Sequence, residues 1–118
     1  MSRREDKVSL LHMRDHAAEA VENVQGRTRS DLDNDRIFAL AMIKLVEIIG
    51  EAAGRVSAEM RDTHLQIPWK QIIGTRHRLV HGYDQIDFDI LWRILSVELP
   101  GILEQLEAIL AENHKNES

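Results

Sequence analysis

The sequence predicts an all-α protein, a small up-and-down bundle of about five helices. Apolar residues recur at helical spacing through most of the chain, and no stretch of useful length alternates with the two-residue period of a strand. Hydrophobic residues make up 43% of the chain and charged residues 30%, a composition typical of globular domains. Because 118 residues suffice for one core and are too few for two, we predict a single helical domain over residues 1–118.

The first predicted helix covers residues 6–25, where apolar side chains repeat every three or four positions. Gly26 is a natural stop after it. Ser30 followed three residues later by Asp33 resembles a capping box, which would begin the second helix at residues 31–54.

The second predicted helix is apolar around most of its circumference between residues 37 and 53. A helix of this kind must be covered on most sides. Either it is the buried central helix of the monomer, or one face packs against a second copy of the chain. Gly50 and Gly54 would let another helix approach closely. The charged positions form one narrow stripe of Lys44, Glu47 and Glu51.

Three further helices follow. A short third helix is predicted over residues 55–63 and a fourth over residues 68–82, with proline in its first turn. The fifth covers residues 87–112, and Pro100 inside it should produce a kink because it removes one backbone hydrogen bond. The tail at residues 113–118 is polar, and we expect it to fray.

Targeting and redox signals are absent from the sequence. The charged N-terminus is followed by no apolar signal region, and the longest apolar stretch, residues 38–43, is far too short to cross a membrane. There are no cysteines, which excludes disulfides and thiolate metal sites. We therefore expect a cytoplasmic protein with no membrane partner.

Acidic residues are unevenly distributed. The formal net charge is −5, yet none of the 20 acidic residues lies between Thr63 and Tyr83. That window contains Lys70, Arg76 and Arg78. A locally positive site on an acidic protein suits a small number of phosphates. The alternative is a chance gap in a partly buried helix.

Reactive side chains gather in this window. Arg76 lies five positions before His81, and Tyr83 follows two positions later. Arginine can stabilise charge that develops on a phosphate, and histidine can transfer a proton near neutral pH. On a helical wheel drawn from Trp69, Arg76 falls among apolar residues. It would then either pair with a carboxylate inside the fold, such as Glu47 or Glu51, or open into a groove.

His81 is expected at the C-terminus of the fourth helix, where the helix dipole favours the protonated form that a general acid needs. The alternative is a surface histidine that caps helix carbonyls. His77 and His81 have the i, i+4 spacing of a metal-binding pair, but no third ligand is evident, so we predict no metal and no cofactor. Trp69 and Trp92 lie on apolar faces and are expected in the core.

Together, Arg76, His81 and Tyr83 resemble the R-x-x-x-x-H-x-Y signature of the HEPN superfamily, most closely its HepT-like ribonuclease toxins. Residues 47–52 resemble the family's second-helix motif, and the Ile-Pro-Trp at residues 67–69 resembles its approach to the site helix. Leu-Pro at residues 99–100 is similar as well. One departure is His77, where relatives often carry Asn or Asp.

The resemblance implies a helical homodimer that brings two copies of the motif to one cleft and cleaves RNA without metal. Arg76 and His81 would be catalytic. The supporting residues would be His77, Tyr83, Glu47 and Glu51. The partner would be a minimal nucleotidyltransferase antitoxin, which can transfer AMP to the motif tyrosine, here Tyr83, and switch the toxin off.

Three functions therefore stand as hypotheses. The first is an endoribonuclease, and the second is an acceptor whose chief role is to carry AMP on Tyr83. The third is a non-catalytic helical dimerisation or partner-binding module, in which Arg76 would be buried against Glu47 or Glu51 and no groove would lie at His81.

Overall fold

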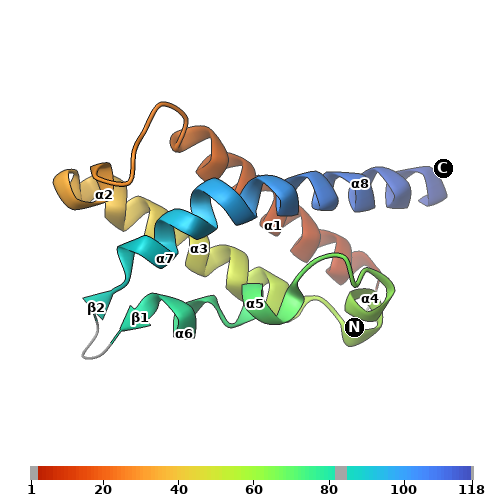
Figure 1. The fold of residues 1–118 in the computed structure, drawn as a ribbon. Coiled ribbons are helices and arrows are strands. Elements are labelled where there is room, and N and C mark those ends of the chain that lie inside the picture. The colour runs from red at the N-terminus through yellow and green to blue at the C-terminus, as the bar shows by residue number, and fades with distance from the viewer. Residues whose placement is uncertain (1–2, 82–84, 118) are drawn as a thin grey trace.

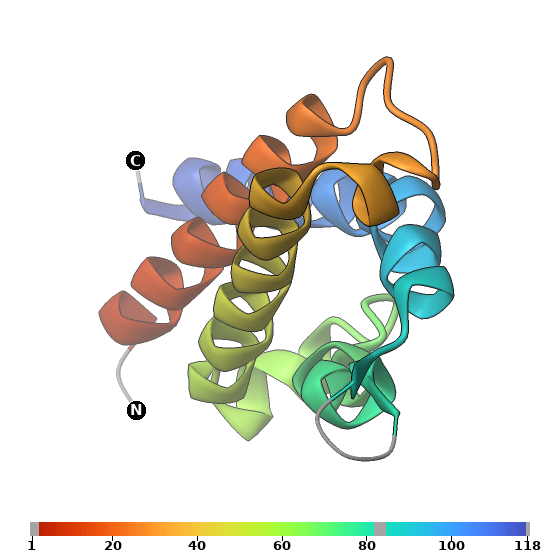
Figure 2. The same ribbon diagram turned by 90° about the vertical axis from the view of Figure 1, so that its left-hand side faces the viewer.

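Three long helices form the body of the computed structural model, which describes residues 3–81 and 85–117. They are α1 (Arg3–Asn23), α3 (Arg36–Arg55) and α8 (Leu99–Glu117). Helix α3 packs against α1 on one side and against α5 (Trp69–Ile73) and α6 (Thr75–Leu79) on the other (Figures 1 and 2). Helix α8 packs against α1. The all-α prediction is confirmed.

The second predicted helix is two helices in the structure. Helix α2 (Asp31–Asn34) ends at Asp35, which is extended and begins α3 as its N-cap. The Asp35 carboxylate accepts a hydrogen bond from the Phe38 N–H at 3.1 Å, and this bond, followed by one from Arg27, lowers the Asp35 pKa. The predicted capping box is wrong, because the Ser30 side chain makes no capping bond.

The fourth predicted helix is also divided. It breaks at Gly74 into α5 and α6, and the chain then leaves the helix at Val80. The Thr75 hydroxyl donates to the Ile72 carbonyl at 2.6 Å, and such side-chain bonds compete with regular helical pairing.

A short hairpin follows α6. Strand β1 (Val80–His81) pairs antiparallel with β2 (Gln85–Ile86), with Val80 opposite Ile86 and His81 opposite Gln85. The prediction of no sheet is therefore wrong for these residues. Only two residues per strand take part, too few to produce a detectable two-residue period in the sequence.

The last predicted helix contains three segments. Helix α7 (Phe88–Arg93) leads into the π-helical turn η1 (Ile94–Glu98) and then into α8. Pro100 lies in the first turn of α8, directly after the wider turn. Helix α8 extends to Glu117, beyond the predicted end at residue 112. The fraying expected at residues 113–118 stays a prediction. The kink at Pro100 stays a prediction.

The hydrophobic core is contributed by α1, α3, α5, α6, α7, η1 and α8. Trp69 is buried and Trp92 packs half-buried against the core, as predicted for both. The fully buried side chains of greatest volume include Leu10, Met13, Met42, Ile49, Leu79, Leu91, Leu95 and Leu106.

Helix α4 (Ala58–Thr63) is attached to the first turn of α1 by a buried carboxylate. Asp6 accepts hydrogen bonds from the Ser57 N–H at 2.8 Å and the Ser57 hydroxyl at 2.7 Å. The same hydroxyl accepts from the Met60 N–H at 3.2 Å and so caps α4. A six-residue helix is too short to be stable alone, so α4 depends on this attachment.

Among residues 3–81 and 85–117, no helix combines the length and the apolar character that crossing a bilayer requires.

Gly50 allows α5 to approach α3 closely. A Cβ atom at Gly50 would lie 2.9 Å from the Ile72 carbonyl oxygen, whereas one at Gly54 would meet nothing within 4 Å. The close approach predicted from the two glycines is thus confirmed at Gly50 and occurs within the chain.

We expect Gly50→Ala to lower the free energy of unfolding by about 1–3 kcal/mol, because backbone must move to relieve the contact. Gly54→Ala is the matched control on the same helix, and it should be neutral or stabilising by up to about 1 kcal/mol. Urea unfolding of the three proteins measures both effects. Equal stability of the two variants would contradict this account.

Candidate functional site

Helix α6 carries three basic side chains in sequence. Arg76 and His77 are exposed, Arg78 is half-buried, and the helix faces the core with Thr75 and Leu79. Arg76 was expected among the apolar residues of a continuous helix. That placement is wrong because the helix breaks at Gly74 and begins again at Thr75. A helical wheel drawn from Trp69 therefore does not give the orientation of the residues after the break.

Arg78 is the arginine that pairs with a carboxylate. Its two terminal nitrogens donate to both oxygens of Glu98 in η1, at 2.9 and 2.7 Å. The side chains are 28% and 19% exposed, so the pair is only partly solvated. The hydrogen bonds from Arg78 lower the Glu98 pKa, and those to Glu98 raise the Arg78 pKa.

Sequence reasoning missed Glu98. The available signal was its isolation, since it is the only charged residue between Arg93 and Glu104 in an otherwise apolar run. A lone carboxylate in such a segment needs a partner. Arg93 also lies near it, with Nε 3.7 Å from a Glu98 oxygen.

Arg76 forms no ion pair with any residue that the structure describes. Glu47 is half-buried and Glu51 is exposed, both on α3, and neither contacts Arg76 as an ion pair within that part of the chain. The buried pair that would mark a non-catalytic module is therefore not formed. A supporting role for Glu47, Glu51 and His77 stays a prediction.

The backbone of His81 lies in strand β1, and Tyr83 lies outside the described residues. The hairpin starts where α6 ends, and the Asp87 N–H donates to the Leu79 carbonyl at 2.7 Å across its base. Asp87 also caps α7 through the N–H groups of Asp89 and Ile90. His81 is thus not at a helix C-terminus, and the helix-dipole argument for its protonation does not apply.

Within residues 3–81 and 85–117, no three His, Asp or Glu side chains are grouped so that they could hold an ion.

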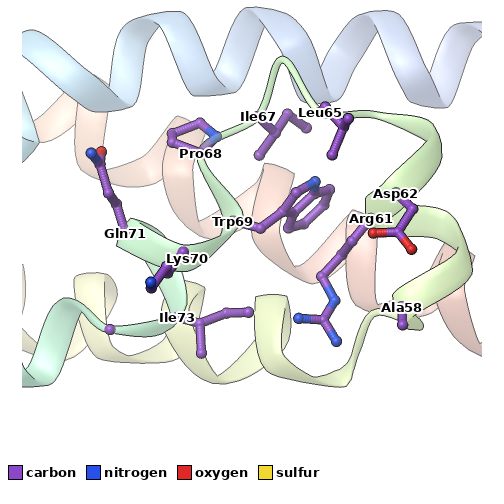
Figure 3. Close-up of a pocket in the computed structure, with 11 residues that line it drawn as sticks. Ala58, Arg61, Asp62, Leu65, Ile67, Pro68, Trp69, Lys70, Gln71 and Ile73 are labelled. Carbon is purple, nitrogen blue, oxygen red and sulfur yellow. The ribbon is translucent and has the colours of Figure 1, made fainter.

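An open groove lies between α4 and α5, with a volume of about 740 Å³. We call it the α4–α5 groove (Figure 3). Its lining includes Arg61, Leu65, Pro68, Trp69, Lys70 and Ile73. It ends at Gly74, where α6 begins.

Comparison with known proteins identifies the family of this chain. Residues 13–109 match the family described as Ribonuclease HepT-like. This chain belongs to the HepT-like ribonuclease family. The matched range contains α6, the hairpin and η1, and thus Arg76, His81, Tyr83 and Glu98.

Individual relatives match most of the chain. A Methanocaldococcus jannaschii protein named "Putative RNase MJ1380" is 30% identical over 109 residues, covering 92% of this chain and 100% of the relative. A Thermococcus cleftensis protein named "Probable ribonuclease HepT" is 30% identical over 96 residues, covering 78% of this chain and 87% of the relative. No solved structure matches the chain significantly.

The Arg78–Glu98 pair should make the stability of this HepT-like protein depend on pH. The Glu98 pKa is lower in the folded state than in the unfolded state, so the pair's contribution is complete above the ordinary value of 4.5 and disappears as the pH falls through the folded-state pKa. Glu98→Gln should reduce the free energy of unfolding at pH 7 by about 1–3 kcal/mol. Its difference from wild type should shrink below the ordinary value.

Asp89→Asn is the control for this experiment. Asp89 accepts a hydrogen bond from Arg29 at 2.8 Å, but its side chain is exposed, so its loss should change stability by less than about 1 kcal/mol. Denaturant unfolding across the acid range measures both. If the loss of unfolding free energy in Glu98→Gln stays constant down to strongly acidic pH, the Arg78–Glu98 pair is not the cause of the pH dependence.

Proposed function

We propose that this protein is a metal-independent endoribonuclease toxin that acts in the cytoplasm. The observation that carries the proposal is the contrast between two arginines of α6 in a chain of the HepT-like ribonuclease family. Arg78 is neutralised by Glu98, whereas Arg76 is exposed and has no ion-pair partner among the described residues. An unpaired guanidinium beside a motif histidine suits a phosphate diester of RNA.

The chemistry follows from the substrate. The 2′-hydroxyl of RNA attacks the adjacent phosphorus and loses its proton, and the 5′-oxygen leaves with a proton, so a 2′,3′-cyclic phosphate remains. We assign one of these proton transfers to His81, as general acid or base. Arg76 would stabilise the negative charge on the pentacoordinate phosphorane. The nucleophile belongs to the RNA itself, so no metal-activated water is required.

A homodimer would bring a second copy of the motif to the same cleft and supply the other proton-transfer group. The outer face of α3 supports this arrangement. Ile37 is 75% exposed and Leu40 is 48% exposed, and they lie one turn apart on this helix. Paired exposed apolar side chains of this kind are a common basis for contact between identical subunits.

Arg76→Ala and His81→Ala should each reduce cleavage of single-stranded RNA by at least about a hundredfold, because each removes a group that acts only in the transition state. The assay contains EDTA, and the product ends are identified as 2′,3′-cyclic phosphates. Cleavage by His81→Ala at the wild-type rate would falsify the mechanism.

Arg55→Ala is the matched control, since Arg55 is an exposed arginine outside the motif and forms no ion pair with a described residue. It should cleave like the wild type. The molar mass of all four proteins is measured by light scattering, together with their melting temperatures. An active wild-type monomer would contradict the shared cleft.

A second function, the acceptor role, is favoured by the position of the motif tyrosine. Tyr83 is two residues from His81, so an adenylyl group on its oxygen would add bulk and negative charge near the proposed phosphate site. We propose that a minimal nucleotidyltransferase antitoxin is the partner that attaches it. The tyrosine oxygen would attack the α-phosphorus of ATP, with release of pyrophosphate.

Co-expression with such an antitoxin should increase the intact mass by one adenylyl group and abolish RNA cleavage. Tyr83→Phe should keep the unmodified mass and its nuclease activity. An adenylyl group that still appears on Tyr83→Phe would place the modification elsewhere.

A further inference from the structure

The α4–α5 groove contains a basic side chain, Arg61, with a donor atom that has no acceptor among the described residues. The Nε atom of Arg61 is buried and has no hydrogen-bond partner among residues 3–81 and 85–117. A buried donor without an acceptor is destabilising, more so when it is charged. A rotation of the half-buried Arg61 side chain would let an anionic oxygen in the groove satisfy this donor.

The groove carries a net positive charge. Lys70 on α5 is exposed, and neither it nor Arg61 forms an ion pair with a described residue. Asp62 is the only acidic residue in the groove lining, and the following 21 residues contain no acid. The groove therefore offers two cations to a ligand, on a protein that is acidic overall.

The walls of the groove are apolar. Leu65 is 76% exposed and Ile73 is 37% exposed, and Figure 3 shows the Trp69 side chain between them with Arg61 extending past the indole. The indole N–H already donates to the His64 carbonyl at 2.9 Å, and Trp69 is only 7% exposed. Trp69 thus forms the floor, while the two aliphatic side chains are available to a base or a sugar.

The groove lies close to the proposed phosphate site along the chain. Gly74 lines its end, and Arg76 follows two residues later, so their Cα atoms are at most about 7 Å apart. That is close to the spacing of neighbouring phosphates along a single strand. An RNA strand held at Arg76 would meet the groove with its next nucleotides.

We propose that the α4–α5 groove is a second RNA-binding site, which holds the nucleotides flanking the scissile phosphate. Arg61 and Lys70 bind the backbone phosphates, and Leu65 and Ile73 contact sugar and base. Hydrogen-bonding groups aimed at base edges are few, so the groove contributes affinity with little sequence preference. The inference rests on the proposed ribonuclease function, because it takes the same strand as its ligand.

The test compares two substrates, a dinucleoside monophosphate that has only the scissile phosphate and a single strand of about eight nucleotides. For the longer RNA, Arg61→Gln/Lys70→Gln should raise KM about three- to tenfold with kcat retained. The slope of log affinity against log salt should fall by about 1.4, since each lost contact with a single strand removes about 0.7. The dinucleotide should be cleaved as by the wild type.

Two further variants test the direction in which KM changes. Asp62→Asn removes the groove's only acid and should lower KM for the longer RNA. Arg55→Gln removes an exposed arginine that is outside the groove and should change neither substrate. If Arg61→Gln does not fold, as judged by its melting curve, Lys70→Gln and Asp62→Asn carry the test, because both positions are exposed.

A binding measurement separates this inference from the proposed function. Fluorescence anisotropy with the longer RNA is recorded in the His81→Ala background, with and without the groove substitutions. If the wild type cleaves no RNA, the proposed function fails. The binding data still show whether the α4–α5 groove binds RNA. Unchanged Kd and salt slope would overturn the inference and favour an acidic protein segment as the occupant. Equal effects on both substrates would also overturn it.

Discussion

The contact between α3 and α5 at Gly50 determines where the candidate site lies. The Ile72 carbonyl approaches α3 so closely that only a glycine fits beneath it. This places α5 and α6 on the flank of the most apolar helix in the chain, opposite α1. One wall of the α4–α5 groove and the three basic residues of α6 are consequently held against a rigid support. A functional surface assembled from five-residue helices needs such a support, because helices of that length have little stability of their own.

Arg76, the arginine of the motif, and Arg78 have different electrostatic environments although they are only two residues apart on α6. Arg78 forms an ion pair with Glu98 through two hydrogen bonds, and this pair also joins α6 to η1. Arg76 is exposed and forms no ion pair with a residue that the structure describes. The fold thus anchors the helix with one guanidinium and leaves the other exposed. Wider turns of the π type often occur at functional sites, and here the turn supplies the anchoring carboxylate.

Much of the fold was predictable because the long helices have strong periodicity. Helices α1, α3 and α8 lie where the apolar spacing predicts helices. The family motif can be recognised in residues 76–83 of the sequence. The errors concern short-range chemistry. Asp35 and Thr75 divide predicted helices through side-chain hydrogen bonds that a pattern of apolar residues does not register. Because the predicted helix is divided at Gly74, a wheel drawn for one continuous helix wrongly placed Arg76 on the buried face. Glu98 was missed because its partner is 20 residues away and only the packing of η1 on α6 reveals it.

The separation of Arg78 from Glu98 also bears on the order in which the protein is made. Synthesis proceeds from the N-terminus, so Asp6, α1 and α3 leave the ribosome before α6 does. When Arg78 emerges, the carboxylate that anchors it has not yet been added, and both Arg76 and Arg78 still carry uncompensated charge. Helix α6 is anchored only after Glu98 has emerged and η1 has packed against it. A nascent chain of this family would therefore fix the position of Arg76 only once the segment through η1 has been translated.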